Sequence, residues 1–263
     1  MRLPECRAVL TGASGGIGLA LAEQLCAGGA RVIAVARRGE ALDDLVRRYP
    51  QQLVWVEADL TCATGRHAVL EAAREMGGLN LLINAAGVNR FAMLEQLDDE
   101  QIAEMLTVNL IATVQLTRLL LPLLRQQHRA LLVNVGSTYG SIGYAGYATY
   151  CASKFAVRGF SEALRRELAD TGVGVLYVAP RATRTAMNSG SAEALNSALK
   201  VATDSPQRVA GAVLAAITAD RSELYLGWPE KFFVRLNGML PGVVDRALRK
   251  QLPTIRQFTK QET

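Results

Sequence analysis

Tyr150 and Lys154 stand four residues apart, and Ser137 lies upstream of them. Residues at positions i and i+4 share one face of a helix. A nearby ammonium favours the phenolate and lowers the pKa of a tyrosine from its ordinary value of about 10. With a serine hydroxyl beside them, these groups could transfer a proton at a substrate oxygen near neutral pH. The spacing alone also fits a solvated helix face.

The start of the chain predicts a nucleotide-binding turn. An apolar run at residues 8–11 leads into Gly12-Ala-Ser-Gly-Gly-Ile-Gly18, and a helical pattern follows over residues 16–27. Glycines let the backbone approach a pyrophosphate closely, and a helix N-terminus offers free N–H groups and the positive end of its dipole. The order of strand, glycine turn and helix distinguishes a dinucleotide site from an ordinary glycine-rich turn.

Three more motifs lie between the glycine turn and the Tyr150–Lys154 pair: Asn84-Ala-Ala-Gly87, Asn109 and Ser137. In this order and at these spacings, the motifs resemble the short-chain dehydrogenase/reductase family over residues 5 to 227. The resemblance implies a single Rossmann-type domain and a nicotinamide cofactor.

The resemblance also implies roles at the reacting centre. Tyr150 would transfer the proton, and Lys154 would lower the pKa of Tyr150 and bind the nicotinamide ribose. Ser137 would donate a hydrogen bond that stabilises charge on the substrate oxygen. Asn109 matches an asparagine that kinks a helix and holds a water near Lys154, which completes a proton relay. The cofactor carries the hydride.

Cofactor contacts are expected along much of the chain. By resemblance, Asp59 and Leu60 lie at the adenine ring, and Thr185 reaches the nicotinamide carboxamide. The full expected set is Gly12, Ser14, Gly16, Ile17, Gly18, Arg37, Arg38, Asp59, Leu60, Asn84, Ala85, Gly87, Tyr150, Lys154, Pro180, Thr183 and Thr185.

The end of the second expected strand indicates NADP(H) rather than NAD(H). An NAD-selective site usually places an acid there to bind the ribose 2′-OH. This chain has Ala36 followed by Arg37 and Arg38, and no acid before Glu40. Two guanidiniums suit a phosphate better than a hydroxyl, and the Ser14 hydroxyl is a further candidate contact to that phosphate.

One motif departs from the family pattern. The segment after the sixth expected strand reads Pro180-Arg-Ala-Thr-Arg-Thr185, with Arg181 in place of the usual glycine. A backbone that needs a positive φ would be strained there. Arg181 or Arg184 could face an anionic substrate group, cover the cofactor phosphate or point to solvent.

Composition limits the other classes of function. The four cysteines, Cys6, Cys26, Cys62 and Cys151, form no C-x-x-C pair, and the two histidines, His67 and His128, are far apart. We therefore expect no metal site and a reduced, cytoplasmic protein. The first residues lead directly into a strand, so no signal peptide is expected, and no apolar run is judged long enough to cross a bilayer. Basic and aromatic residues do not interleave as in nucleic-acid binders.

Alternating strand and helix patterns predict an α/β fold. Strands are expected at residues 8–11, 31–36, 53–57, 79–84, 130–136, 174–179 and 223–227, and helices at 16–27, 40–49, 65–76, 99–127, 148–171 and 205–219. This alternation is typical of a doubly wound, Rossmann-type parallel sheet of about seven strands with helices on both faces. The first 229 residues would form this domain, with residues 230–263 as its extension.

The segment at residues 183–205 is rich in Ser, Ala, Asn and Thr. It follows a strand at the edge of the sheet where α/β folds bind ligands, which favours a mobile substrate lid over a plain surface loop. A lipophilic substrate is suggested by residues expected along the cleft: Tyr139, Ile142, Tyr144, Tyr147, Met187 and Asn188.

The last residues form a basic amphipathic segment. Of the formal net charge of +5, residues 230–263 carry +4, from seven basic and three acidic residues. Apolar residues recur at helical spacing, with Pro241 as a kink or break. Packing over the cleft or against another subunit is favoured over attachment to an anionic membrane surface.

These observations predict an NADPH-dependent reductase that interconverts a carbonyl and an alcohol, with a lipophilic or 3-oxoacyl substrate as a candidate. The alternative is a module that senses NADP(H) or recruits partners without useful turnover. By resemblance, helices 99–127 and 148–171 would pair across a two-fold axis, which predicts a homodimer and leaves a tetramer open. Residues available for the sheet and the partner are Leu116, Leu119, Leu120, Leu123, Phe155, Phe160 and Leu164.

Overall fold

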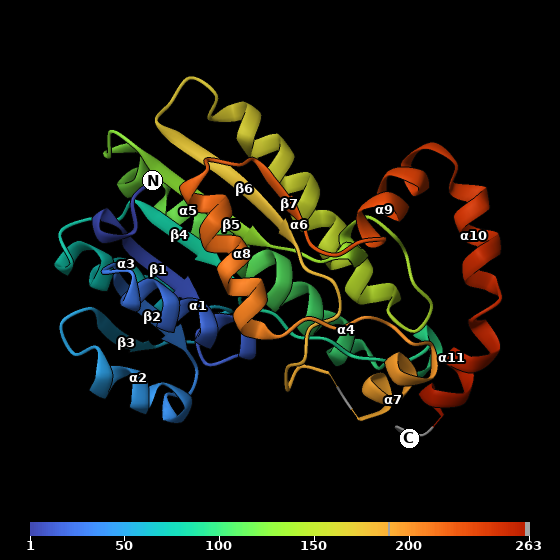
Figure 1. The fold of residues 1–263 in the computed structure, drawn as a ribbon. Helices are drawn as coiled ribbons and strands as arrows, with labels where there is room; N and C mark the ends of the chain where they lie inside the picture. The colour runs from blue at the N-terminus through green and yellow to red at the C-terminus, as the bar shows by residue number, and fades with distance from the viewer. Residues whose placement is uncertain (189, 261–263) are drawn as a thin grey trace.

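The computed structural model describes residues 1–188 and 190–260. Seven strands form one parallel sheet in the order β3-β2-β1-β4-β5-β6-β7 (Figure 1). Their bounds are β1 (Arg7–Thr11), β2 (Arg31–Ala36), β3 (Leu53–Glu57), β4 (Leu81–Asn84), β5 (Ala130–Val135), β6 (Val173–Ala179) and β7 (Glu223–Tyr225). The predicted doubly wound α/β fold is confirmed.

Helices cover both faces of the sheet because its strands are apolar on both sides. Along β1, Ala8 and Leu10 belong to one core and Val9 to the other, as the two-residue period of a strand requires. The first core is completed by α1 (Gly16–Ala27), α2 (Asp43–Arg48) and α8 (Pro206–Thr218). The second is completed by α3 (Ala63–Glu75), α5 (Ala112–Arg125) and α6 (Ala148–Glu167).

The strand order reverses between β1 and β4. The chain runs outward from β1 through β2 to β3, then returns past β1 to β4 and continues to β7. Connections that leave neighbouring strands in opposite directions open a crevice at their carboxyl ends, and ligands of open α/β sheets bind there. The glycine turn follows β1 and the Asn84–Gly87 motif follows β4, so both lie at this crevice.

The helix before β5 corrects the expectation that no apolar run is long enough to cross a bilayer. Helix α4 (Asp99–Leu106), a π-helical turn (Thr107–Ile111) and α5 form one continuous helix, Asp99–Arg125. Among the described residues, this helix alone is long and apolar enough to cross a membrane by length and composition. Buried residues of α5 such as Leu116 and Leu120 pack against the sheet, as in the core helix of a globular domain.

The expected lid and tail form helices that pack together. The lid segment contains α7 (Gly190–Ala198), and the tail forms α9 (Glu230–Met239), α10 (Pro241–Arg249) and α11 (Leu252–Thr259). The break expected at Pro241 is therefore present. Ile255 of α11 is fully buried in a cluster with Ala192 and Leu195 of α7. Ser189 of the expected lid and residues 261–263 of the tail lie outside the described residues. Mobility of the lid stays a prediction.

Candidate active site

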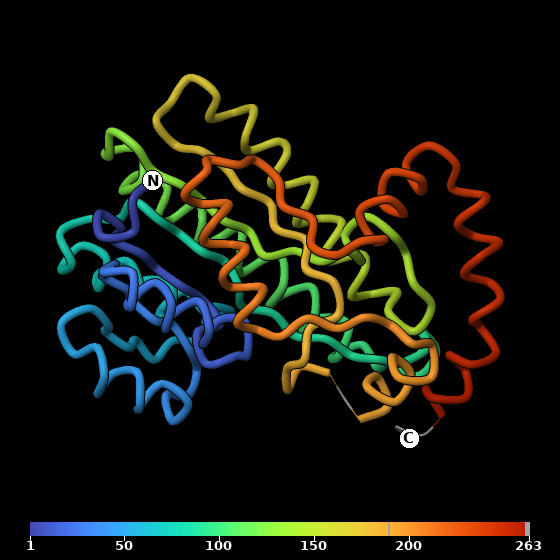
Figure 2. Tube along the Cα trace, viewed as in Figure 1, coloured from blue at the N-terminus to red at the C-terminus, as the bar shows by residue number. Residues whose placement is uncertain are grey.

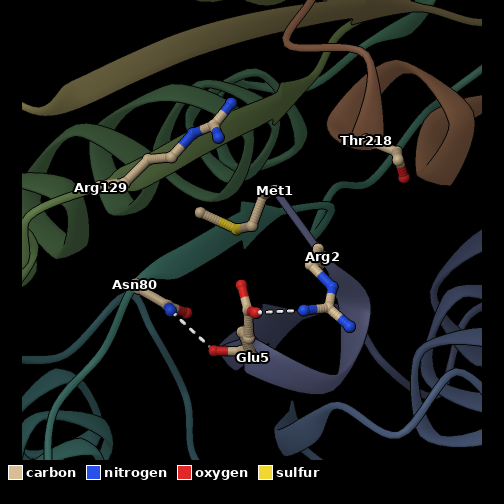
Figure 3. Close-up of a pocket in the computed structure, with 6 residues that line it drawn as sticks. All are labelled: Met1, Arg2, Glu5, Asn80, Arg129 and Thr218. Carbon is tan, nitrogen blue, oxygen red and sulfur yellow. Dashed lines mark hydrogen bonds and ion pairs between the residues drawn. The ribbon is translucent and has the colours of Figure 1, made fainter.

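A cavity of about 640 Å³ lies at the carboxyl ends of the central strands. It brings together residues that are more than 170 positions apart in the sequence. Those expected from the sequence are Gly12, Ser14, Gly16, Ile17, Gly18, Ala85, Gly87, Ser137, Tyr150, Lys154, Pro180, Thr183 and Thr185. A smaller hollow of about 360 Å³ lies near the amino ends of β1, β4 and β5 and is lined by Met1, Arg2, Glu5, Asn80, Arg129 and Thr218 (Figure 3). Its charged groups pair with each other or with Asp220, Asn80 bonds the Glu5 carbonyl, and Thr218 bonds the Leu214 carbonyl, and the hollow contains none of the expected site residues.

The glycine turn approaches the end of β4 too closely for side chains. Gly12 has a φ of +66°, and a Cβ added there would lie 2.8 Å from the Cα of Ala86. The Thr11 hydroxyl oxygen accepts hydrogen bonds from the backbone N–H groups of Ala85 and Ala86, at 3.0 and 3.1 Å. One side chain therefore fixes the β4 turn against the glycine turn. Their backbones form one wall of the cavity.

Tyr150 and Ser137 both line the cavity, with their side chains close enough for Ser137 to lower the pKa of Tyr150. Burial raises the pKa of Tyr150 to about 12, and the hydrogen bond to Ser137 lowers it only in part. The expected lowering below 10 was therefore wrong for this structure. The reason is that the Lys154 ammonium lies over the face of the Tyr150 ring, 5.6 Å from its centroid, and does not offset the loss of solvation.

Lys154 is itself almost fully buried. Its Nζ donates a hydrogen bond to the Val135 carbonyl oxygen at 3.2 Å, and burial lowers the pKa of the ammonium to about 8. The Tyr150 phenol and the Lys154 ammonium thus lie on one helix face, as their spacing predicts. Both are displaced by burial toward their neutral forms.

Asn109 lies in the π-helical turn of the long helix. Such single turns often occur at functional sites. Its Oδ1 accepts from the Val88 N–H at 2.8 Å, and its Nδ2 donates to the Val88 carbonyl and the Ser153 hydroxyl, both at 3.0 Å. A Cβ added at Gly87 would lie 3.1 Å from Asn109 Oδ1 and 3.5 Å from Lys154 Nζ. Asn109 therefore holds the end of the β4 motif beside Lys154. The expected water stays a prediction.

Asn84 does not line the cavity. Its Nδ2 donates to Thr117 Oγ1 at 3.1 Å and to Asn134 Oδ1 at 2.9 Å, and Asn134 donates to the Ser161 hydroxyl at 2.8 Å. These buried bonds join β4 and β5 to α5 and α6, because the side chain at this position turns into the second core. The side chain therefore stabilises the central strands, and the cofactor contact expected of Asn84 stays a prediction.

Four other expected cofactor residues lie outside the cavity lining. Arg37 and Arg38 are exposed beyond the end of β2, and Asp59 and Leu60 follow β3. The backbone N–H and hydroxyl of Thr61 donate to the Asp59 carboxylate, at 2.9 and 2.8 Å. These bonds and the Arg37 guanidinium lower the pKa of Asp59.

Sequence reasoning missed Tyr177, which supports Ser137 from the middle of the sheet. Its hydroxyl donates to the Ser137 carbonyl oxygen at 3.1 Å and accepts from the Ser137 N–H at 3.5 Å. The side chain is fully buried, and burial raises the pKa of its phenol. The one available signal was a polar atom within the otherwise apolar strand 173–179.

Aromatic rings line the part of the cavity where the sequence predicts the substrate. Tyr139 stacks on Tyr144 with 5.2 Å between ring centroids and contacts Tyr147 at 5.1 Å. Burial raises the pKa of Tyr139 and Tyr144, so these rings provide apolar surface. The tail supplies lining residues that the sequence analysis did not assign to the site: Phe233, Val244, Ala247, Leu248 and Gln251.

Arg181 is part of an ion-pair cluster inside the protein. Its guanidinium binds the Asp204 carboxylate through two contacts of 2.9 and 3.0 Å and lies 3.4 Å from Glu230. Arg181 is not among the residues with positive φ, so the expected strain is absent at this residue. The Arg181 side chain instead joins the end of β6 to Asp204, two residues before α8, and to the start of α9.

Comparisons with known proteins agree on one family. A family model described as short chain dehydrogenase matches residues 7–196. Oxidoreductase BOA17 of Botryotinia fuckeliana is 35% identical over 181 residues, which cover 67% of this chain and 65% of that protein. The 3-oxoacyl-[acyl-carrier-protein] reductase FabG of Vibrio cholerae is 34% identical over 204 residues, or 77% and 82% of the two chains.

A solved structure shares the fold. The short chain dehydrogenase from Burkholderia cenocepacia, determined in complex with NADP, superposes with a TM-score of 0.81 and is 29% identical. The match covers 94% of this chain and 99% of that one. This chain spans just under two thirds of BOA17 and a larger share of the other two proteins.

The contact between Tyr177 and Ser137 predicts a positioning role. Tyr177→Phe should lower kcat about fivefold to tenfold, because a lost hydrogen bond contributes about 1 kcal/mol. The Kd for NADPH should stay within about twofold. Tyr225→Phe, which removes a neighbouring hydroxyl, is the matched control and should retain its kcat. Equal losses in both variants would contradict the assignment.

Burial of Lys154 predicts a particular dependence of stability on pH. The native pKa of about 8 lies below the ordinary lysine value of 10.5, so between these values the unfolded chain binds more protons than the native chain. The free energy of unfolding should then rise with pH by up to about 1.4 kcal/mol per pH unit from this group. Below pH 8 the contribution of Lys154 to the free energy of unfolding should not change with pH.

Urea unfolding of wild type and Lys154→Met from pH 7 to 10 measures this effect. The difference between the two free energies should change above pH 8, with wild type gaining relative to the variant. Parallel curves throughout the range would show that Lys154 titrates normally in the folded protein.

Proposed function

We propose that this chain, which belongs to the short-chain dehydrogenase family and is an NAD(P)-dependent oxidoreductase of carbonyl and alcohol groups, reduces a lipophilic carbonyl compound with NADPH. The observation that carries the proposal is the convergence of Ser137, Tyr150 and Lys154 in one cavity with the glycine turn. The relatives named as reductases support reduction of the carbonyl as the direction of the reaction. The alternative of a sensing module without turnover finds no support in the comparisons.

The cavity wall fits a dinucleotide. A Cβ added at Gly16 would lie 2.6 Å from the Thr185 side chain, so a larger residue at position 16 would displace Thr185. Gly12, Gly16 and Gly18 would face the phosphates, and Lys154 and Thr185 would hold the nicotinamide end. Asn89 Oδ1 is buried at the same cavity without a hydrogen-bond partner among the described residues, and it can accept one from a bound group. The cofactor would supply the hydride.

The side chains at the reacting centre suit proton donation. A pKa of about 12 keeps the Tyr150 phenol protonated at neutral pH, so it can donate to a carbonyl oxygen that gains negative charge. The Ser137 hydroxyl lies within hydrogen-bonding reach of Tyr150 and would stabilise the same oxygen. Lys154, charged below pH 8, would favour the phenolate that remains after the transfer. The cation is thus needed when the phenolate forms.

A preference for NADPH is supported at the end of β2. Ala36 is buried, and Arg37 and Arg38 follow as exposed cations near the crevice edge, with no acid before Glu40. Their position outside the cavity lining agrees with a phosphate held at the rim by flexible guanidiniums. The Burkholderia relative in complex with NADP supports the same preference.

The substrate side supports a lipophilic carbonyl compound. Tyrosine rings and the tail residues Phe233, Val244 and Leu248 give it an extended apolar lining. A 3-oxoacyl chain, the substrate class in the name of the Vibrio relative, combines a reducible ketone with an apolar tail. Such a chain fits this lining.

We also propose a homodimer in the cytoplasm. Of the residues expected to serve the sheet and a partner, Leu116, Leu120 and Leu164 are buried against the sheet. Ile111 and Phe155 remain exposed on the long helix and on α6, and Leu119, Leu123 and Phe160 are only partly buried. These residues support pairing through α5 and α6.

Replacing the proton donor tests the proposed chemistry. Tyr150→Phe should lower the rate of carbonyl-dependent NADPH oxidation about 10²-fold or more, because the acid is lost. The Kd for NADPH, measured by fluorescence, should stay nearly unchanged because the ring remains. Tyr144→Phe removes another hydroxyl from the same cavity and should retain most of the rate. A Tyr150→Phe variant with more than a tenth of wild-type turnover would refute the assignment.

Reversing the charge of Arg37 tests the proposed preference for NADPH over NADH. Arg37→Asp should weaken NADPH binding about tenfold or more and raise the ratio of NADH to NADPH turnover. Arg166→Asp makes the same change in charge on an exposed residue near the far end of α6 and should leave the ratio unchanged. A wild-type preference for NADH would defeat the proposed cofactor.

A further inference from the structure

The turn between α9 and α10 presents large apolar side chains outward. Met239 is 80% exposed and Leu240 55%, and they precede Pro241 and Gly242 at the turn. Trp228, before α9, is 74% exposed and contacts Phe232, with 6.3 Å between ring centroids. The turn projects from the rest of the molecule (Figures 1 and 2). Scattered exposed apolar residues are normal, but a group of them on one projecting hairpin indicates a binding surface.

The same hairpin covers the catalytic cavity. Phe233 of α9 and Val244 and Leu248 of α10 line it, and Val244 is buried. Asn237 Nδ2 donates to the Ser141 carbonyl oxygen at 3.0 Å, which fixes α9 beside the cavity. Val243, next to Val244 in sequence, is half exposed. One side of the hairpin therefore faces the cavity, while apolar residues beside it face outward.

The charges of the hairpin determine what kind of partner suits it. Residues 228–250 contain five basic and two acidic residues, a net charge of +3. The five basic residues are Lys231, Arg235, Arg246, Arg249 and Lys250. All five side chains are exposed, and none of them makes an ion pair with another described residue. Of the two acids, Glu230 is already paired with Arg181 at 3.4 Å. An apolar tip with unpaired cations matches an anionic lipid surface, where apolar side chains enter the acyl boundary and cations lie at the headgroups.

We propose that the α9–α10 hairpin, residues 228–250, is a docking surface for anionic lipid bilayers. The tip residues Met239, Leu240 and Val243 enter the bilayer interface, and Trp228 lies at headgroup depth, where amphipathic rings concentrate. Docking in this way places the cavity beneath the hairpin next to the lipid. The packing of α11 on α7 is compatible with it, because α11 anchors the end of the tail while the tip stays free. The docking does not depend on which carbonyl compound is reduced.

Vesicle sedimentation with the full chain tests the proposal. Vesicles of phosphatidylcholine alone are compared with vesicles containing an equal part of phosphatidylglycerol. Wild type should bind the anionic vesicles at least about tenfold more strongly, and the difference should shrink as salt is raised, because exposed charges are screened. Leu240→Glu should lower binding to the anionic vesicles about tenfold or more.

A matched variant separates a local effect from a general change of charge. Leu94, outside the tail, is 56% exposed, so Leu94→Glu alters charge and exposed apolar area as Leu240→Glu does. The Leu94→Glu variant should bind as wild type. Arg246→Glu with Arg249→Glu should remove the preference for anionic vesicles. Thermal unfolding of each variant should match wild type, since none of these side chains is buried.

Three results would overturn the proposal. Wild type could fail to bind either kind of vesicle, or Leu240→Glu could bind as well as Leu94→Glu. Finally, light scattering could show that Leu240→Glu forms smaller oligomers than wild type, while wild type binds no vesicles. In that case a second copy of the chain covers the tip. NADPH oxidation with a water-soluble carbonyl compound is measured for every variant. A variant that loses lipid binding but keeps NADPH oxidation bears on the docking proposal alone. Lipid binding by a protein that does not oxidise NADPH bears on the proposed function alone.

Discussion

The reversal of strand order between β1 and β4 is the constraint on which the site depends. Neighbouring strands whose connections leave in opposite directions cannot be covered by one loop, so a crevice stays open at their carboxyl ends. The Thr11 hydroxyl holds the two edges of this crevice together through the N–H groups of Ala85 and Ala86. Because the backbones meet there, Gly12 has no room for a side chain. This close approach leaves the backbone of the glycine turn uncovered by side chains, so that phosphates could reach it.

Burial has two opposing effects at the reacting centre. It raises the pKa of Tyr150 and lowers that of Lys154, so each group is held toward its neutral form. At neutral pH the Tyr150 phenol is neutral while the Lys154 ammonium is still charged, so a buried cation is present before a negative charge develops on the phenol oxygen. Tyr177 fixes the backbone of Ser137, and Asn109 fixes Val88 beside Lys154.

The tail covers one side of the cavity. Helix α11 fastens the tail to α7 through Ile255, and α9 and α10 then cover the cavity with Phe233, Val244 and Leu248. Arg181 replaces a glycine of the family pattern and binds Asp204 and Glu230, so it connects the sheet to the start of α9. A substitution that looks costly in the sequence therefore has a structural use. The hairpin is positioned by contacts at both of its ends, and its turn remains outside them.

The amino-acid sequence by itself determined the fold and the reactive groups. The two-residue burial pattern of the strands, the glycine turn after residues 8–11 and the spacing of Tyr150 and Lys154 are local features, and local features follow from chain geometry. The sequence could not determine the pKa of Tyr150, the inward turn of Asn84 or the partners of Arg181. These depend on solvation and on residues that are distant in the chain, such as Asp204 and Glu230 for Arg181. Only tertiary structure brings such groups together, because burial and long-range pairing are properties of the packed molecule.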